Sequence, residues 1–257
     1  MLHVTDTDRV RILRLDRPQA RNAFDIALYD ATTDALLAAA DDPTVAVVVI
    51  TGTGDAFSAG NDIGDMARLA AGEIGPGRHG FTGMVETLID FPKPVICAVN
   101  GLGVGIGATI LGLCDLAFMA RTARLRCPFT RLAVAPEAAS SATFPRLLGR
   151  QNATWVLLSS EWIDAETAAA MGLVFAVTEP DELMSVTLDH ARILASKPIS
   201  SLVASKRLVV EPYRAEMKAA LAREGEAFGH LLGAPANLEA MRAFAEKREP
   251  DFSGIDT

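Results

Sequence analysis

Glu137 is the one acidic residue in a run of apolar and small residues, VAPEAASSATF, that covers positions 134–144. A carboxylate in apolar surroundings can accept and return a proton, because desolvation raises its pKa. A local role is the alternative. Pro136 suits the first turn of a helix, where a carboxylate meets unpaired N–H groups and the positive end of the helix dipole. Taken alone, the segment favours this local role, so residues elsewhere in the chain have to decide.

Two loops combine small residues with a predicted helix start: FSAGNDI over 57–63 and GVGIGA over 103–108. Closely spaced glycines let backbone N–H groups approach a ligand and point at an anion or at a developing oxyanion. Each loop can therefore offer one N–H group to the same oxygen atom. Two tight turns whose glycines serve packing alone are the other interpretation, and the loops by themselves favour neither.

The glycines of GVGIGA also match the dinucleotide-binding pattern G-x-G-x-x-A and follow a predicted strand. That pattern belongs near the N-terminus of a Rossmann unit and needs an acidic residue about 20 positions further on. Positions 116–136 contain neither Asp nor Glu. We therefore do not interpret this loop as a nucleotide site.

The bulk composition indicates one globular α/β unit and excludes several classes of protein. Half of the 257 residues are apolar, which suffices for one sizeable core, and no fixed-period repeat is present. The net charge of −8 and the lack of a basic stripe speak against nucleic-acid binding. We expect no membrane span and no signal peptide, and the widely spaced cysteines suggest reduced thiols in a cytoplasmic protein. The histidines show no metal-ligand spacing, so no metal is expected.

Hydrophobic patterns place these features on repeated strand–helix units. RVRILRLD alternates over 9–16, while VAVVVITG and KPVICAVNG are continuous runs typical of buried parallel strands. The glycine-rich segment 72–80 is expected to be flexible, with His79 facing solvent. Asp164 and Gly172 are the expected caps of a helix between them. The later chain is mainly helical, with helices predicted over 181–197, 199–210, 213–231 and 236–247.

Four phrases, in this order, resemble the enoyl-CoA hydratase/isomerase (crotonase) superfamily: LDRPQARNAF, VVVITGTGDAFSAGNDI, KPVICAVNGLGVGIGATILGLCDLAF and AMGLVFAV. The resemblance implies an α/β fold, a crotonase-like ββα-superhelix spiral core. We expect this core over 1–195, followed within the same fold unit by a helical region over 196–257 for oligomerisation and the CoA entrance. It also implies an acyl-CoA thioester substrate, with coenzyme A as part of the substrate and no further cofactor. The expected assembly is a homotrimer or a dimer of trimers.

The same resemblance assigns roles to individual residues. It implies that the backbone N–H groups of Asn61 and Ile106 form an oxyanion hole for the thioester oxygen. A donor of this kind is set by the backbone, so the identity of the side chain matters little. The residues implied to lie along the bound coenzyme A are Arg17, Arg21, Ala59, Gly60, Asp62, Gly105, Lys206 and Lys247, the last from a neighbouring subunit.

The choice of reaction rests on glutamates. The hydratases of the superfamily share two glutamates that activate water. The resemblance places Thr109 and Phe129 at the two corresponding positions of this chain. The phrase CPFTRLAVAPEAASSATFPRLLG instead resembles the peroxisomal-type 3,2-enoyl-CoA isomerases, whose catalytic carboxylate corresponds to Glu137. We therefore expect an isomerase of fatty acid β-oxidation that moves a 3-enoyl-CoA double bond to the 2-position. A broad enoyl-CoA hydratase that uses Glu137 and a non-catalytic acyl-CoA binding protein are the alternatives.

Overall fold

The computed structural model describes residues 1–255 of the chain, and its elements alternate between strands and helices. They follow one another as β1 (Leu2–Thr7), β2 (Val10–Leu15), η1 (Pro18–Ala20), α1 (Ile26–Asp41), β3 (Val47–Gly52), β4 (Ala56–Ser58), α2 (Ile63–Ala70), α3 (Gly80–Asp90), β5 (Val95–Val99), β6 (Leu102–Val104), α4 (Ile106–Thr109), η2 (Ile110–Leu113), β7 (Leu116–Ala120), β8 (Arg124–Arg126), α5 (Ser140–Ser159), β9 (Trp162–Asp164), α6 (Ala165–Met171), β10 (Ala176–Thr178), α7 (Leu183–Ala195), α8 (Ile199–Leu231) and α9 (Pro235–Glu246). No helix among the described residues is long and apolar enough to cross a membrane.

The larger sheet has the strand order β1-β2-β3-β5-β7-β10. Its first pair is antiparallel and its other pairs are parallel. Every residue of β3 and of β5 is buried, as continuous apolar runs require when both faces of a parallel sheet are covered. The strands predicted from RVRILRLD, VAVVVITG and KPVICAVNG are confirmed as β2, β3 and β5.

The smaller sheet has the order β4-β6-β8-β9, and the chain visits it directly after strands of the larger sheet. Thus β3 leads into β4, β5 into β6 and β7 into β8, with helices between successive visits. This repetition is the ββα spiral that the family resemblance implied. Because β4 and β6 are parallel neighbours, the loops that follow them leave the sheet at the same edge.

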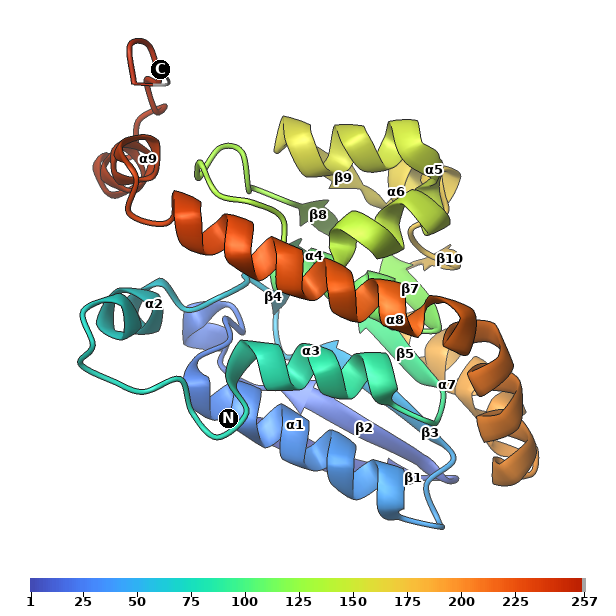
Figure 1. Cartoon of the computed structure of the whole chain (residues 1–257). Coiled ribbons are helices and arrows are strands. Elements are labelled where there is room, and N and C mark those ends of the chain that lie inside the picture. Colours follow the sequence, from blue (N-terminus) through green and yellow to red (C-terminus); the bar gives the residue numbers. More distant parts are fainter. Residues whose placement is uncertain (256–257) are drawn as a thin grey trace.

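The long helix α8 joins the C-terminal region to the spiral core. Figure 1 shows α8 crossing the molecule between α3 and α5, and it contacts both helices. Ala220 and Leu221 of α8 belong to the same buried cluster as the strands. The predicted boundary between residues 195 and 196 falls in the link between α7 and α8, and the last two residues of the predicted region lie outside the described residues.

One predicted break in this region is wrong. The helices expected over 199–210 and 213–231 form the single helix α8, with Pro212 inside it. Proline removes one backbone hydrogen bond from a helix and usually kinks it. Here Glu211, Pro212 and Tyr213 are all exposed, so water can hydrate the carbonyl group that loses its partner. The predicted caps of α6 are confirmed, because the Asp164 side chain accepts from Thr167 N and Gly172 is left-handed.

Candidate active site

Glu137 lines a cavity of about 610 Å³, and its side chain is buried, with the residue 7% exposed. Thr109 Oγ1 donates a hydrogen bond to Glu137 Oε1 at 2.6 Å. The second oxygen, Oε2, is buried and has no hydrogen-bond partner among the described residues. Burial raises the pKa of Glu137 to about 8, the Thr109 hydrogen bond opposes this, and the negative charge of Glu224 adds to it. The carboxyl group is thus suited to exchanging a proton near neutral pH.

The interpretation of Glu137 as a helix-start residue is wrong. Helix α5 begins at Ser140, and Ala138 and Ala139 before it have left-handed φ angles of 58° and 56°. Its first N–H groups are satisfied from a distance, by Glu224 of α8, which accepts from Ala139 N at 2.7 Å and from Ser141 N at 2.8 Å. The side chain of Glu137 is therefore free to serve the cavity.

Residues from several elements that are far apart in the sequence line the cavity. Its apolar lining comes from α1 and the residues before it, from α2, from α3 and from α8, and includes Phe24, Ile26, Met66, Phe81, Leu221 and Phe228. Such walls favour an apolar group, because its burial removes hydrophobic surface from water. The arrangement therefore holds a buried carboxyl group against a space suited to an acyl chain.

The last residues of the glycine-rich segment, directly before α3, are held by hydrogen bonds to α1. Asp30 of α1 accepts hydrogen bonds from the backbone N–H groups of Arg78, His79 and Gly80 at 3.0, 2.8 and 3.0 Å. The His79 ring lies 3.0 Å from Asp34, and its side chain is 22% exposed, so the prediction that it faces solvent is wrong. His79 and Gly80 both line the cavity, so the contacts of Asp30 hold part of its wall in place.

The two glycine loops lie side by side because β4 and β6 are paired. Ser58 stands opposite Gly103 in the parallel register. Gly60 has φ +96°, and a Cβ atom on it would lie 2.9 Å from the carbonyl oxygen of Val104. Gly105 has φ +54°, and a Cβ atom on it would lie 3.9 Å from Gly60 Cα. The positive φ angles therefore favour glycine at both positions, and the close approach of the loops requires glycine at Gly60.

Each loop presents one backbone N–H group that the fold leaves available. Phe24 N donates to Gly60 O at 2.7 Å and Asp62 N donates to Phe24 O at 2.8 Å, which fixes the backbone on both sides of Asn61. Ile106 is the first residue of α4, a position whose N–H group has no partner within a helix. Neither Asn61 N nor Ile106 N has a hydrogen-bond acceptor in the part of the chain that the structure describes. The loops thus offer two amide donors from adjacent backbone segments.

Tyr29 is a residue of the site that the sequence did not reveal. Its hydroxyl group donates to Asn61 Oδ1, and its ring lines the cavity. Burial, and next the charge of Glu137, raise the pKa of Tyr29 well above its ordinary value, so the hydroxyl stays protonated and remains a donor. The Asn61 side chain is held by this bond, which leaves its backbone amide as the free group. Tyr29 lies on the buried face of α1 together with Leu28 and Leu36, a pattern that indicates a core residue, so no local signal distinguishes it.

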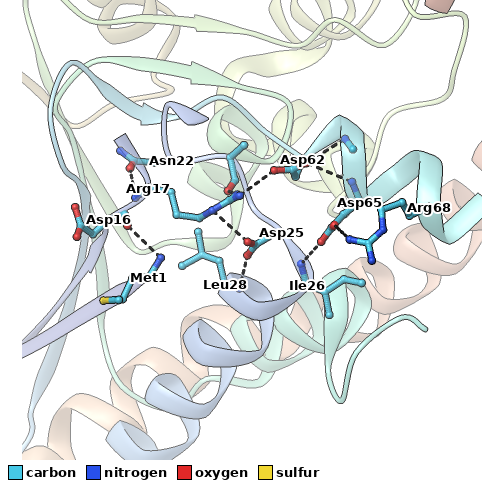
Figure 2. A network of polar contacts seen from close by, with 12 residues as sticks. Met1, Asp16, Arg17, Asn22, Asp25, Ile26, Leu28, Asp62, Asp65 and Arg68 are labelled. Carbon is cyan, nitrogen blue, oxygen red and sulfur yellow. Dashed lines mark hydrogen bonds and ion pairs between the residues drawn. The ribbon is translucent and has the colours of Figure 1, made fainter. Parts of the chain in front are cut away.

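Arg17 is engaged with carboxylates inside the protein. Figure 2 shows its guanidinium between Asp25 and Asp62, at 3.1 and 3.0 Å. These two aspartates cap the starts of α1 and α2, so Arg17 ties the two helices together. Arg21 is exposed, and its carbonyl oxygen accepts from Ala59 N at 2.9 Å. The contacts of both arginines with coenzyme A stay predictions.

Lys206 and Lys247, the two lysines predicted to contact coenzyme A, lie outside the cavity lining. Lys206 Nζ is 2.7 Å from Asp115 Oδ2 and donates to Lys93 O at 2.9 Å, and its side chain is only 8% exposed. A phosphate group would have to compete with this ion pair. Lys247 follows the last residue of α9 in a left-handed conformation and is exposed.

In contrast, the structure brings Gly60, Asn61, Gly105 and Ile106 together, with Ala59 and Asp62 flanking the first pair. Within residues 1–255, no cluster of three or more His, Cys, Asp or Glu side chains is arranged to hold a metal ion.

Comparison with known proteins identifies the family of the chain. The sequence model of the enoyl-CoA hydratase/isomerase family matches residues 6–255. The chain is 35% identical over 259 residues to the 2,3-dehydroadipyl-CoA hydratase of Escherichia coli strain K12, which covers 98% of each chain. It is 34% identical over 209 residues to enoyl-CoA delta isomerase 2 of Rattus norvegicus, which covers 80% of this chain and 53% of that protein. A solved structure of an enoyl-CoA hydratase from Mycobacterium marinum is 61% identical, with a TM-score of 0.79 over 82% of this chain and 99% of that chain. The chain therefore belongs to the enoyl-CoA hydratase/isomerase family.

Proposed function

We propose that this protein is a 3,2-enoyl-CoA isomerase in which Glu137 is the single acid–base group. The observation that carries the proposal is the buried carboxyl group of Glu137, with one oxygen held by Thr109 and the other without a partner among the described residues. Leaving a buried polar atom unsatisfied is unfavourable for folding. An acyl-CoA binding protein without turnover has no use for such a group, whereas a proton-transfer enzyme requires it.

The reaction can be written with residues of this chain alone. The acyl chain occupies the cavity, and the thioester oxygen lies between the amides of Asn61 and Ile106. Glu137 removes a proton from C2, and the electron pair of that C–H bond moves into a dienolate whose negative charge rests on the thioester oxygen. Glu137 then returns the proton to C4, and the double bond ends between C2 and C3. Each preorganised donor to the oxygen contributes about 3 to 4 kcal/mol to transition-state stabilisation.

The hydratase alternative is favoured by the names of several relatives, among them the Escherichia coli protein at 35% identity. The residues of this chain speak against it. Thr109 holds Glu137 instead of supplying a second carboxylate, and the Phe129 residue is only 4% exposed and apolar. A water molecule activated for addition needs an acceptor and a separate proton donor. The isomerase needs one group that serves in both steps.

Incubation with 3-hexenoyl-CoA is expected to produce the absorbance of a conjugated enoyl thioester, without consumption of water. Crotonyl-CoA is the matched substrate, because hydration of it removes the same absorbance. Conversion of crotonyl-CoA with no reaction of 3-hexenoyl-CoA would overturn the isomerase assignment in favour of a hydratase. Binding of both esters with turnover of neither would make the protein a binding module.

The pH dependence provides an independent expectation. Glu137 must be ionised to accept the C2 proton, and its pKa is raised to about 8, first by burial. The rate constant kcat/KM is therefore expected to rise with pH through a midpoint of about 8. Steady-state kinetics between pH 5 and pH 10 measure this directly. A rate already constant from pH 6 upward would show that another group is the base.

An isomerase of this kind serves the β-oxidation of unsaturated fatty acids, where double bonds at the 3-position have to become conjugated with the thioester. The homotrimer or dimer of trimers, the cytoplasmic location and the coenzyme A contacts of Arg17, Arg21, Lys206 and Lys247 stay predictions.

A further inference from the structure

Glu224 is a second buried carboxylate at the cavity, and the reaction proposed above does not use it. It lies on α8 and is 6% exposed. Its Oε2 accepts a hydrogen bond from Ala139 N and its Oε1 accepts one from Ser141 N, from residues 85 and 83 positions away in the sequence. Each oxygen of Glu224 thus holds one N–H group of the segment that directly follows Glu137.

That segment has a conformation that the residues themselves disfavour. Ala138 and Ala139 are consecutive non-glycine residues with φ angles of 58° and 56°. Left-handed conformations place the Cβ atom too close to the carbonyl oxygen, so alanine adopts them only where surrounding contacts require it. Ser140 N closes the turn by donating to Glu137 O at 3.1 Å. Ala138 and Ala139 are buried in the core, and Glu224 adds two hydrogen bonds to the backbone of the turn from another element.

The charge of Glu224 also acts on Glu137. Burial raises the pKa of Glu224, and the hydrogen bonds from Ser141 and from the backbone N–H group of Ala139 oppose this rise. Its negative charge contributes to the raised pKa of Glu137, after burial and the opposing Thr109 bond. The other titratable groups that face Glu137 are Tyr29 on α1 and Cys127 after β8, and both are held neutral by burial. The remaining charged or titratable side chains of the cavity are Asp62, Asp65, His79, Glu86 and Lys218, and Arg223 acts on Glu224 from its own helix.

We propose that Glu224 is a positioning residue, whose carboxylate holds the left-handed turn at Ala138 and Ala139 and thereby directs Glu137 into the cavity. The proposal rests on the function proposed above, since it assumes that Glu137 is the base. It gives α8 a role in the chemistry of the spiral core. The sequence holds a signal for it, because Leu221, Glu224 and Phe228 share one helical face on which the other two residues are apolar.

The test compares Glu224→Gln with Glu226→Gln, a matched change on the same helix at a side chain that is 76% exposed. Glutamine can accept one N–H group, but its NH₂ group then faces the other N–H. We expect Glu224→Gln to lower kcat roughly 10- to 100-fold while KM stays within about threefold, as for a displaced catalytic group. The midpoint of the pH profile should move to lower pH, because a negative charge beside Glu137 is removed. Glu226→Gln should leave kcat, KM and the midpoint unchanged.

Several outcomes would overturn the proposal. Unchanged kcat in a folded Glu224→Gln protein is one, and equal losses in both variants are another. Glu224→Asp provides the second variant: it keeps the charge but shortens the side chain, so kcat should fall without the shift in pH midpoint. If both variants fail to fold, Glu224 holds the fold and does not specifically direct the base.

A structural measurement separates this inference from the proposed function. In a crystal structure of Glu224→Gln, the turn at Ala138 and Ala139 should change and the contact between Glu137 and Thr109 should be lost. An unaltered turn with that contact intact would overturn the positioning role, whatever the enzyme converts. Failure of the wild-type protein to isomerise 3-hexenoyl-CoA, in contrast, would overturn the proposed function and leave this structural comparison valid.

Discussion

Replacing Glu137 by glutamine is expected to lower kcat for 3-hexenoyl-CoA by about 10² to 10⁴-fold, the contribution of positioned acid–base catalysis. Glutamine fills the same volume and can still accept the hydrogen bond of Thr109 Oγ1. It cannot take the C2 proton, so the loss should appear in kcat. Affinity for hexanoyl-CoA, a saturated ester that does not react, should stay near that of the wild type. Titration calorimetry with hexanoyl-CoA and steady-state kinetics measure the two effects separately, and activity above about one hundredth of wild type would contradict a sole base.

Thermal melts of the same variant provide the control for folding, and their pH dependence has a definite sign. The pKa of Glu137 is raised from an ordinary 4.5 to about 8 in the folded protein, chiefly by burial. Between these values the folded state holds a proton that the unfolded state releases, so the free energy of unfolding falls as pH rises. Glutamine has no such penalty. The Tm of the variant minus the Tm of the wild type should therefore be larger at pH 9 than at pH 5. An equal Tm difference at the two pH values would contradict the raised pKa.

Replacing Gly60 by alanine is expected to lower kcat by about 10²-fold, the loss seen when one oxyanion donor is removed. The added Cβ atom would lie 2.9 Å from Val104 O at a φ angle of +96°. Backbone atoms have to move to relieve this contact, and the neighbouring N–H group of Asn61 moves with them. The expected signature is a fall in kcat at nearly constant affinity for hexanoyl-CoA.

Gly54→Ala is the matched control for that prediction. Gly54 has φ +79°, and its added Cβ atom would lie 3.8 Å from Pro18 Cβ, an ordinary van der Waals distance. Both substitutions place alanine at a positive φ angle, so both should lower Tm, and the contact with Val104 O should make the loss larger for Gly60→Ala. Only the change at Gly60 crowds the second loop. Equal kcat values for the two variants would show that the two loops do not supply the oxyanion donors.

The sequence predicted the features that depend on neighbouring residues. Continuous apolar runs indicated the buried strands β3 and β5, and Asp164 and Gly172 marked the ends of α6. Clustered glycines indicated the two loops at Gly60 and Gly105. These signals are local, because side-chain periodicity, capping and φ preferences act over a few residues. The ordered phrases also indicated the family, since they extend along nearly the whole chain.

Local signals failed where a distant element competes with a neighbour. Pro136 predicted a helix start at Glu137, yet the carboxylate that serves the start of α5 is Glu224, 85 positions from Ala139. The composition around His79 predicted an exposed side chain, yet Asp30 accepts the N–H groups of residues 78–80 from a distance of about 50 positions, and the His79 ring lies 3.0 Å from Asp34. The pairing of Lys206 with Asp115 is a further contact between distant residues that the sequence did not indicate.

The sequence by itself therefore determined the buried strands, the ends of α6, the positions of the two glycine loops and the carboxylate that stands among apolar residues. The tertiary structure decided which of these meet. The register of β4 and β6 sets the two amide donors side by side, and α8 turns Glu137 into the cavity by binding the backbone after it. The physical reason is that propensity and periodicity act through bonds and nearby turns, whereas burial and pairing depend on contacts between residues that only the folded chain brings together.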